Sequence, residues 1–336
     1  MRWFGWVVSV ALLLPAVRAD AQTLERVRER GQVVCGVRPD VPGFASRGAD
    51  GTVVGFDVEF CRAVAAAVLG DAARFRAEMA PAEQHFAALA TGRIDLISGA
   101  TDQTFRAGLG AGTAFLAITF HDSLSFLVPA AGAVKRLSHL RHATVCVAAD
   151  ALDPDRVISV FAAQEVEVKP LVLSSTAAVT AYGAGRCAAI AAPLAHLAEL
   201  RRGLEDPAAH RIVAVPSSRL ARGLLVRRED PSWIDIVRWS FYVLVNAEEL
   251  GLTRANVDDV KAQATRPDVR RLLGLEGGLG RLIGLDDAFA YRIIQQVGNY
   301  GEVYNRYLGR DAPLNLPRGA NAPVARGGLL FVPPFR

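Results

Sequence analysis

The chain has 336 residues and a formal net charge of +4, and 51% of its residues are hydrophobic. This length is enough for about two domains with cores of their own. The arginines are scattered rather than gathered into one basic stripe, which argues against a nucleic-acid-binding protein. Neither the histidines nor the four cysteines have the spacing of metal ligands, so we expect no metal and no cofactor.

The first 21 residues predict a secretory signal peptide. Arg2 gives a positive start, residues 3–14 form an apolar run, and Ala19-Asp20-Ala21 is a small-residue cleavage site. A membrane anchor is the alternative, but the run is shorter than the ~20 residues that span a bilayer. We therefore expect the mature chain to be exported, and to be periplasmic if the source is a two-membrane bacterium.

The mature chain repeats one order of elements: strand, helix, strand, helix, strand. The first copy follows a short helix at 23–30 and occupies 32–37, 57–69, 74–79, 83–90 and 94–97, with Asp57 as the expected helix cap. The second copy occupies 143–147, 154–163, 167–173, 176–183 and 188–192, with Asp153 as cap. Residues 86–95 also resemble residues 179–188. Two βαβαβ units predict an α/β protein with two similar lobes, each built on a parallel sheet.

Two extended stretches, at residues 120–129 and 220–227, are predicted to connect the lobes. Two such connections make a hinge, in which few residues absorb the change when the lobes close. We therefore assign residues 22–122 and 226–336 to lobe 1, with a C-terminal helical extension, and residues 123–225 to lobe 2.

The four cysteines are Cys35, Cys61, Cys146 and Cys187, all in the exported part of the chain, where disulfides persist. Counting alone leaves three pairings open, and four free thiols are a less favoured alternative. Each predicted lobe contains two cysteines, and pairing within the lobes leaves the lobes free to move relative to each other.

A candidate anion site follows the third predicted strand. The predicted strand 94–97, which is apolar except for Asp95, runs into a small polar turn at Gly99, and Thr101, Thr104 and Arg106 follow. Backbone N–H groups, hydroxyls and a guanidinium are the donors that a carboxylate needs. In open α/β sheets, ligands bind at the loop after a strand's carboxyl end. We therefore predict a carboxylate site here, with a solvated helix-start arginine as the alternative for Arg106.

Several stretches along the mature chain resemble one protein family. They are Pro42-Gly43-Phe44, Gly55-Phe56-Asp57-Val58, Val145-Cys146-Val147, Gly185-Arg186-Cys187, Asn246-Ala247-Glu248-Glu249-Leu250-Gly251 and Gln296-Val297-Gly298-Asn299-Tyr300. They are similar to the periplasmic substrate-binding proteins of ABC importers for polar amino acids (family 3), especially the general L-amino-acid-binding branch. The resemblance implies the type II periplasmic-binding-protein fold, with two lobes joined by two crossover strands, a monomer, and a membrane permease as partner. Together with the lobe argument, it predicts the disulfides Cys35–Cys61 and Cys146–Cys187.

The resemblance also implies ligand contacts, and the chain departs from some of them. Arg106 falls at or within one residue of the family's carboxylate-binding arginine, Thr101 and Thr104 match, and Phe44 is expected either as a lid over the ligand or as plain core. In lobe 2, residues 148–152 lack the family's hydroxyls and contain Asp150, a candidate contact or helix cap. Pro193 stands where the family has the aspartate that pairs with the ligand's ammonium. Apart from Asp150, no replacing acid is apparent nearby, which favours a ligand with a carboxylate and no strictly required α-ammonium.

Three function classes remain open. A solute-binding component of an ABC importer, capturing a small amino-acid-like or carboxylate ligand, is favoured. A non-transport sensor or interaction protein on the same fold is the main alternative. A dehydratase-like enzyme would need a placed general acid or base, for which only Asp150 and His121 are candidates, so we predict no enzyme and no catalytic residues. His121 and Asp122 are interpreted as hinge residues.

Overall fold

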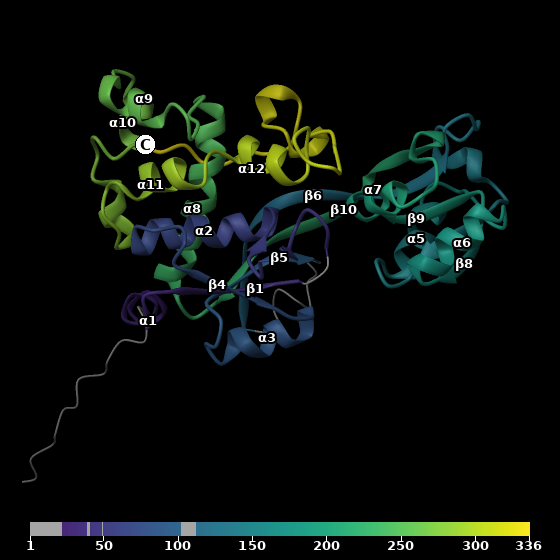
Figure 1. Ribbon diagram of the computed structural model, residues 1–336, viewed down its shortest axis with the longest axis horizontal. Coiled ribbons are helices and arrows are strands. Elements are labelled where there is room, and N and C mark those ends of the chain that lie inside the picture. Colours follow the sequence, from purple (N-terminus) through teal and green to yellow (C-terminus); the bar gives the residue numbers. More distant parts are fainter. Residues whose placement is uncertain (1–21, 39–40, 49, 102–111) are drawn as a thin grey trace, which may run out of the picture.

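The computed structural model describes residues 22–38, 41–48, 50–101 and 112–336. Figure 1 shows two bodies of unequal size that are joined by the long strands β6 and β10. None of the helices in these ranges is long and apolar enough to cross a membrane. The strands are β1 Val33–Val37, β2 Ser46–Arg47, β3 Val53–Val54, β4 Phe75–Met79, β5 Leu96–Thr101, β6 Thr113–Pro129, β7 Thr144–Ala148, β8 Lys169–Leu173, β9 Ala189–Pro193 and β10 His210–Arg227. The helices are α1 Gln22–Arg30, α2 Phe56–Leu69, α3 Ala82–Ala90, α5 Pro154–Ala162, α6 Ser175–Gly183, α7 Leu194–Arg202, α8 Pro231–Glu249, α9 Val257–Gln263, α10 Pro267–Leu272, α11 Phe289–Gln296 and α12 Tyr300–Tyr307.

One eight-stranded sheet runs through both bodies, in the order β4-β1-β5-β10-β6-β9-β7-β8. The outer strands pair in parallel on each side, β4-β1-β5 in one body and β9-β7-β8 in the other. Between them, β6 and β10 pair antiparallel with each other over most of their length. The predicted two-lobe α/β fold with two crossover strands is thus confirmed. The crossovers are longer than predicted, because each strand continues into the sheet of a lobe. The lobe boundaries at residues 122 and 226 stay a prediction.

Apolar cores lie on both faces of the sheet in each lobe, and the main lobe 1 cluster also includes Ala195 and Ala198 of α7 in lobe 2. In lobe 1, one face packs against α2, α8, α11 and α12, while Val34, Ile97 and Leu225 turn to the other face, which α3 covers. In lobe 2, alternation along β7 and β9 divides the core. Val145 and Ala191 belong to the cluster with Phe161 of α5, whereas Cys146 and Ile190 belong to the cluster with Ala178 of α6. This period of two is what a strand buried on both faces produces.

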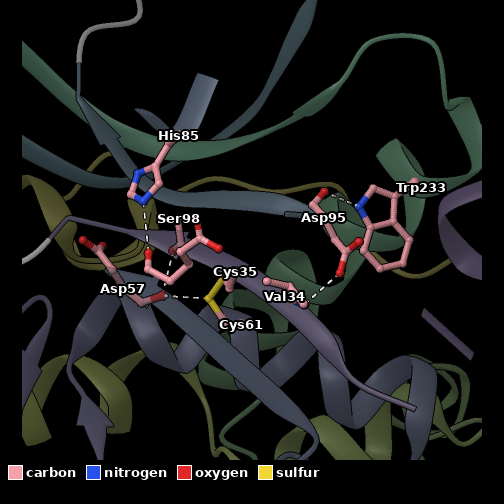
Figure 2. The surroundings of a disulfide bond; sticks show 9 residues. Val34, Cys35, Asp57, Cys61, His85, Asp95, Ser98 and Trp233 are labelled. Atoms are coloured by element: carbon pink, nitrogen blue, oxygen red, sulfur yellow. Dashed lines mark hydrogen bonds between the residues drawn. A yellow bond between two sulfur atoms is a disulfide. The ribbon is translucent and has the colours of Figure 1, made fainter. Parts of the chain in front are cut away.

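Both predicted disulfides are present. Cys35 of β1 is bonded to Cys61 of α2, with the two Cα atoms 6.1 Å apart (Figure 2). Cys146 of β7 is bonded to Cys187, just before β9, with the Cα atoms 5.7 Å apart. Each bridge therefore lies within one lobe and does not cross the hinge.

The predicted role of Asp57 as a helix cap is wrong. Gly55 occupies the N-cap position of α2, and Asp57 lies inside the first turn with its side chain in the core. Ser98 Oγ of β5 donates to the backbone carbonyl of Asp57 at 2.7 Å (Figure 2). The carboxylate instead pairs with an arginine of β10, which is part of the candidate site.

Candidate ligand-binding site

A cavity of about 480 Å³ opens where the two lobes meet the crossover strands. Its volume is in the range of small-molecule sites. Lobe 1 contributes Arg38 and Val41, and β6 and β10 contribute Asp122, Leu220, Ala221 and Arg222. Lobe 2 contributes Ala149, Asp150, Ala151, Leu152, Asp153, Arg156, Pro193, Ala195 and His196. The lining is therefore polar and mixed in charge, which suits a small ligand that carries charges of both signs.

Asp122 is a buried carboxylate at this cavity. The residue is 8% exposed, and Oδ1 accepts a hydrogen bond from the Ser123 N–H at 2.8 Å. The backbone N–H groups of Leu194 and Ala195, at the start of α7, also favour the ionised form of this carboxyl. Burial raises the pKa of Asp122 to about 6, and these N–H groups and the nearby Arg222 only partly oppose the shift.

Arg222 is held on the opposite crossover strand by a buried partner and an aromatic ring. Its Nη2 donates to Asp57 Oδ2 at 2.8 Å, and both residues are almost fully buried. The guanidinium carbon lies 4.0 Å from the centre of the Phe44 ring. Burial raises the pKa of Asp57, and Arg222 opposes this rise. Gly99 makes room for the pair, because a Cβ on its backbone would lie 1.9 Å from Asp57 Oδ2.

The lobe 2 wall of the cavity contains a chain of three polar side chains. Asp150 Oδ1 accepts from the backbone N–H of Ser175 at 2.9 Å and from the Ser175 hydroxyl at 2.8 Å. The same hydroxyl oxygen lies 2.7 Å from Nε2 of His196, in the first turn of α7. Burial lowers the pKa of His196, and the Asp150 carboxylate opposes this.

The predicted site residues fall in different places. Asp150 lines the cavity and accepts from the Ser175 N–H, but it is not a helix N-cap, because Ser174 occupies that position in α6 and Asp153 in α5. Phe44 is fully buried and packs edge-on against Phe56 and Phe120, as the core alternative expects. Gly99 and Thr101 lie in β5, where the backbone of Thr101 pairs with Arg222.

Two of the predicted residues, Thr104 and Arg106, lie outside the described residues. The carboxylate site at Gly99, Thr101, Thr104 and Arg106, and the contacts of Phe44 and Asp150 with a ligand, stay predictions.

The sequence reasoning missed an acid beside Pro193. Asp122 was interpreted as a hinge residue, yet it lines the same cavity as Pro193. The signal lies in the strand register, because Leu124 of β6 pairs with Pro193 of β9 and so brings the crossover strand to the end of β9. The expectation that Asp150 is the only acid near this position is therefore wrong. Arg222 and His196 were missed as well, since neither belongs to a motif that stands out along the chain.

The fold and the cavity together define a two-lobe ligand-binding protein. Residues 33–250 match the family of bacterial extracellular solute-binding proteins, family 3. The chain belongs to this family. Its members bind solutes, in agreement with the prediction that the protein is not an enzyme.

Full-length relatives support this assignment. The chain is 40% identical to the glutamate/glutamine/aspartate/asparagine-binding protein BztA of Rhodobacter capsulatus, over 99% of this chain and 98% of that protein. It is 37% identical to the general L-amino acid-binding periplasmic protein AapJ of Rhizobium johnstonii, over 98% of this chain and 97% of that protein. A solved ABC transporter periplasmic binding protein from Brucella ovis, with glutathione bound, is 36% identical with a TM-score of 0.82, over 95% of this chain and 100% of that chain.

Proposed function

We propose that this protein is the amino-acid-binding component of an ABC importer and that Asp122 binds the α-ammonium of its ligand. The relatives that it resembles over nearly their whole length are named as binders of amino acids or of glutathione. Glutathione itself carries an α-ammonium and an α-carboxylate on its glutamyl residue, so the same charge pattern is common to these ligands. The protein works in the periplasm, and its proposed partner is the importer's membrane permease.

The buried carboxyl of Asp122 is the observation that supports this choice. A carboxylate removed from water is costly unless a cation pairs with it. An ammonium placed in the cavity supplies that cation, and the carboxylate in turn compensates the desolvation of the ammonium. In the family, an aspartate at the position of Pro193 pairs with the ligand's ammonium, and we assign this role to Asp122. An α-amino acid then has a partner for its ammonium in this protein as well.

The ligand's α-carboxylate is assigned to Arg106 with Thr101 and Thr104, as the resemblance implies. Arg222 faces the same cavity from β10, but Asp57 already neutralises much of its charge. We therefore give Arg222 a supporting part, in which its fixed guanidinium adds positive potential near the ligand's carboxylate.

Calorimetry at pH 7.5 tests the assignment. We expect at least one of L-glutamate, L-glutamine, L-asparagine, L-leucine and glutathione to bind with a Kd below about 10 μM. The deaminated analogue of that ligand should bind about 30-fold more weakly or worse, since loss of one partner of a buried charge pair costs about 2 kcal/mol or more. Asp122→Asn should weaken the binding of the amino acid by a similar factor, and Arg106→Ala should abolish binding.

A matched control is Asp153→Asn. Asp153 lines the same cavity, but its carboxylate caps α5 by accepting from the Asp155 N–H at 3.0 Å, and asparagine caps a helix equally well. The affinity of the Asp153→Asn variant for the amino acid should stay near that of the wild type. If the deaminated analogue binds as tightly as the amino acid, the ammonium is not recognised, and the earlier expectation of a plain carboxylate ligand is correct.

A further inference from the structure

The chain of Asp150, Ser175 and His196 fixes where the imidazole carries its proton. An ionised carboxylate can only accept, so the Ser175 hydroxyl donates its single proton to Asp150 Oδ1, at 2.8 Å. The hydroxyl oxygen then has only lone pairs left for His196, whose Nε2 lies 2.7 Å away. Nε2 must therefore carry the hydrogen and donate it to Ser175. The neutral ring consequently has its lone pair on Nδ1.

Nδ1 is the nitrogen that remains for a ligand. Within the part of the chain that the structure describes, no hydrogen bond to it is found, and it is not among the buried polar atoms without a partner. His196 lines the cavity and directly follows Leu194 and Ala195, whose N–H groups oppose the rise in the pKa of Asp122. Because burial lowers the pKa of His196, the ring is neutral at pH 7.5. An acceptor nitrogen thus stands beside the proposed ammonium site.

We propose that His196 is a specificity-determining residue that accepts a hydrogen bond from an N–H group in the ligand's side chain. This proposal rests on the proposed function and goes beyond it, because it selects among amino acids. Side chains that end in an amide satisfy Nδ1. A side-chain carboxylate at the same place would bring its oxygen lone pairs against the lone pair of Nδ1. Neither group would then have a hydrogen-bond donor.

The overall charge of the cavity does not decide this preference. The lining residues that the structure describes include equal numbers of arginines and aspartates, namely Arg38, Arg156, Arg222, Asp122, Asp150 and Asp153, and Arg106 is already assigned to the ligand's α-carboxylate. Discrimination between an amide and a carboxylate of the same shape therefore depends on the local donor and acceptor pattern. At a polar site, a ligand that leaves a buried group without a hydrogen bond binds more weakly than a ligand of the same shape that satisfies it.

Nuclear magnetic resonance tests the tautomer without any ligand. The ¹⁵N chemical shifts of His196 at pH 7.5 should show a protonated Nε2 and an unprotonated Nδ1. Ser175→Ala removes the hydroxyl but keeps the backbone N–H that bonds to Asp150, so the ring should relax to a mixture of tautomers. The matched control is Ser174→Ala, the neighbouring N-cap hydroxyl, which bonds to the Ala177 N–H and not to His196. A protonated Nδ1 in the wild type would overturn the proposal.

Calorimetry with L-glutamine and L-glutamate then tests the selectivity. In the wild type and in Ser174→Ala, glutamine should bind about tenfold more tightly or better. In His196→Ala and Ser175→Ala, the ratio should fall to about threefold or less. Binding of both amino acids without this preference, or a preference that survives His196→Ala, would count against the role of His196 alone. Absence of binding by both amino acids in the wild type would overturn this role of His196. Absence of binding by all five candidate ligands would count against the proposed function as well.

Discussion

The carboxyl of Asp122 makes the ligand-free protein sensitive to pH. Its pKa of about 6 in the folded protein lies above the ordinary value of about 4 for an unfolded chain. The folded state thus holds this proton more tightly than the unfolded state does. The resulting stabilisation is complete below pH 4 and is lost as the pH rises to about 6. Above about pH 6, the buried carboxyl is charged, and the free energy of unfolding is lower than it is with the carboxyl protonated.

Asp122→Asn should therefore stabilise the ligand-free protein at neutral pH. A shift of about two pKa units corresponds to at most ~3 kcal/mol, because one unit is about 1.4 kcal/mol. We expect a higher free energy of unfolding for the variant at pH 7.5 and no gain at pH 4, measured by urea unfolding. Asp153→Asn serves again as the control with little change. A variant that is less stable at pH 7.5 would mean that the carboxylate is well compensated without a ligand.

The C-terminal segment that follows α12 is attached to strand β6. Asn321 Oδ1 accepts from the His121 N–H at 2.7 Å, and Asn321 Nδ2 donates to the His121 carbonyl at 2.9 Å. Arg318 holds this segment in turn, with bonds of 3.0 Å to both oxygens of the buried Glu248 in α8. Nearby, Tyr300 Oη donates to the Thr119 carbonyl at 2.8 Å. The crossover strand is thus supported just before Asp122 by residues beyond the family match at 33–250.

Asn321→Ala should lower the stability of the protein. It leaves a backbone N–H and a carbonyl of β6 without their partner, and each such group costs about 1–3 kcal/mol when buried. We expect a loss of roughly 2 kcal/mol or more in thermal or urea unfolding. Arg326→Ala is the control, since Arg326 pairs with Glu248 from an exposed position in the same segment and should cost less than about 1 kcal/mol. Equal losses in the two variants would show that the contact with His121 contributes nothing specific.

Hydrophobic patterning was enough to predict most helices and strands, since most of them bury an apolar face, although the predicted strand β8 is largely exposed. The disulfides also followed from the division into lobes and from the resemblance. Asp57 was placed wrongly because an acid at a helix start favours a local cap, whereas its actual partner, Arg222, is 165 residues away. The place of Asp122 at the cavity was overlooked for the same reason. Its position at the cavity depends on the register between β6 and β9, which no local pattern contains.

The arrangement of the two lobes allows them to move as units. β6 and β10 carry the chain from one body to the other, and each disulfide stays within one body (Figure 1). A ligand that contacts both walls of the cavity stabilises the closed arrangement by its extra contacts there.

Binding should therefore compact the protein. Small-angle scattering of the mature chain should show a lower radius of gyration with a saturating ligand identified by calorimetry than without it. The control is an amino acid that calorimetry shows not to bind, added at the same concentration. An unchanged radius of gyration with the bound ligand would contradict closure and would favour the sensor or interaction protein on a rigid fold.

The location of Asp122 on a crossover strand has a kinetic consequence. A pivot moves least when two bodies rotate about it, so this carboxylate keeps its place in both the open and the closed arrangement. If Asp122 binds the ligand's ammonium as proposed, an arriving ligand is anchored there before either lobe has turned. Association rates should then be similar for all ligands that carry an ammonium, and differences among their affinities should come from their dissociation rates.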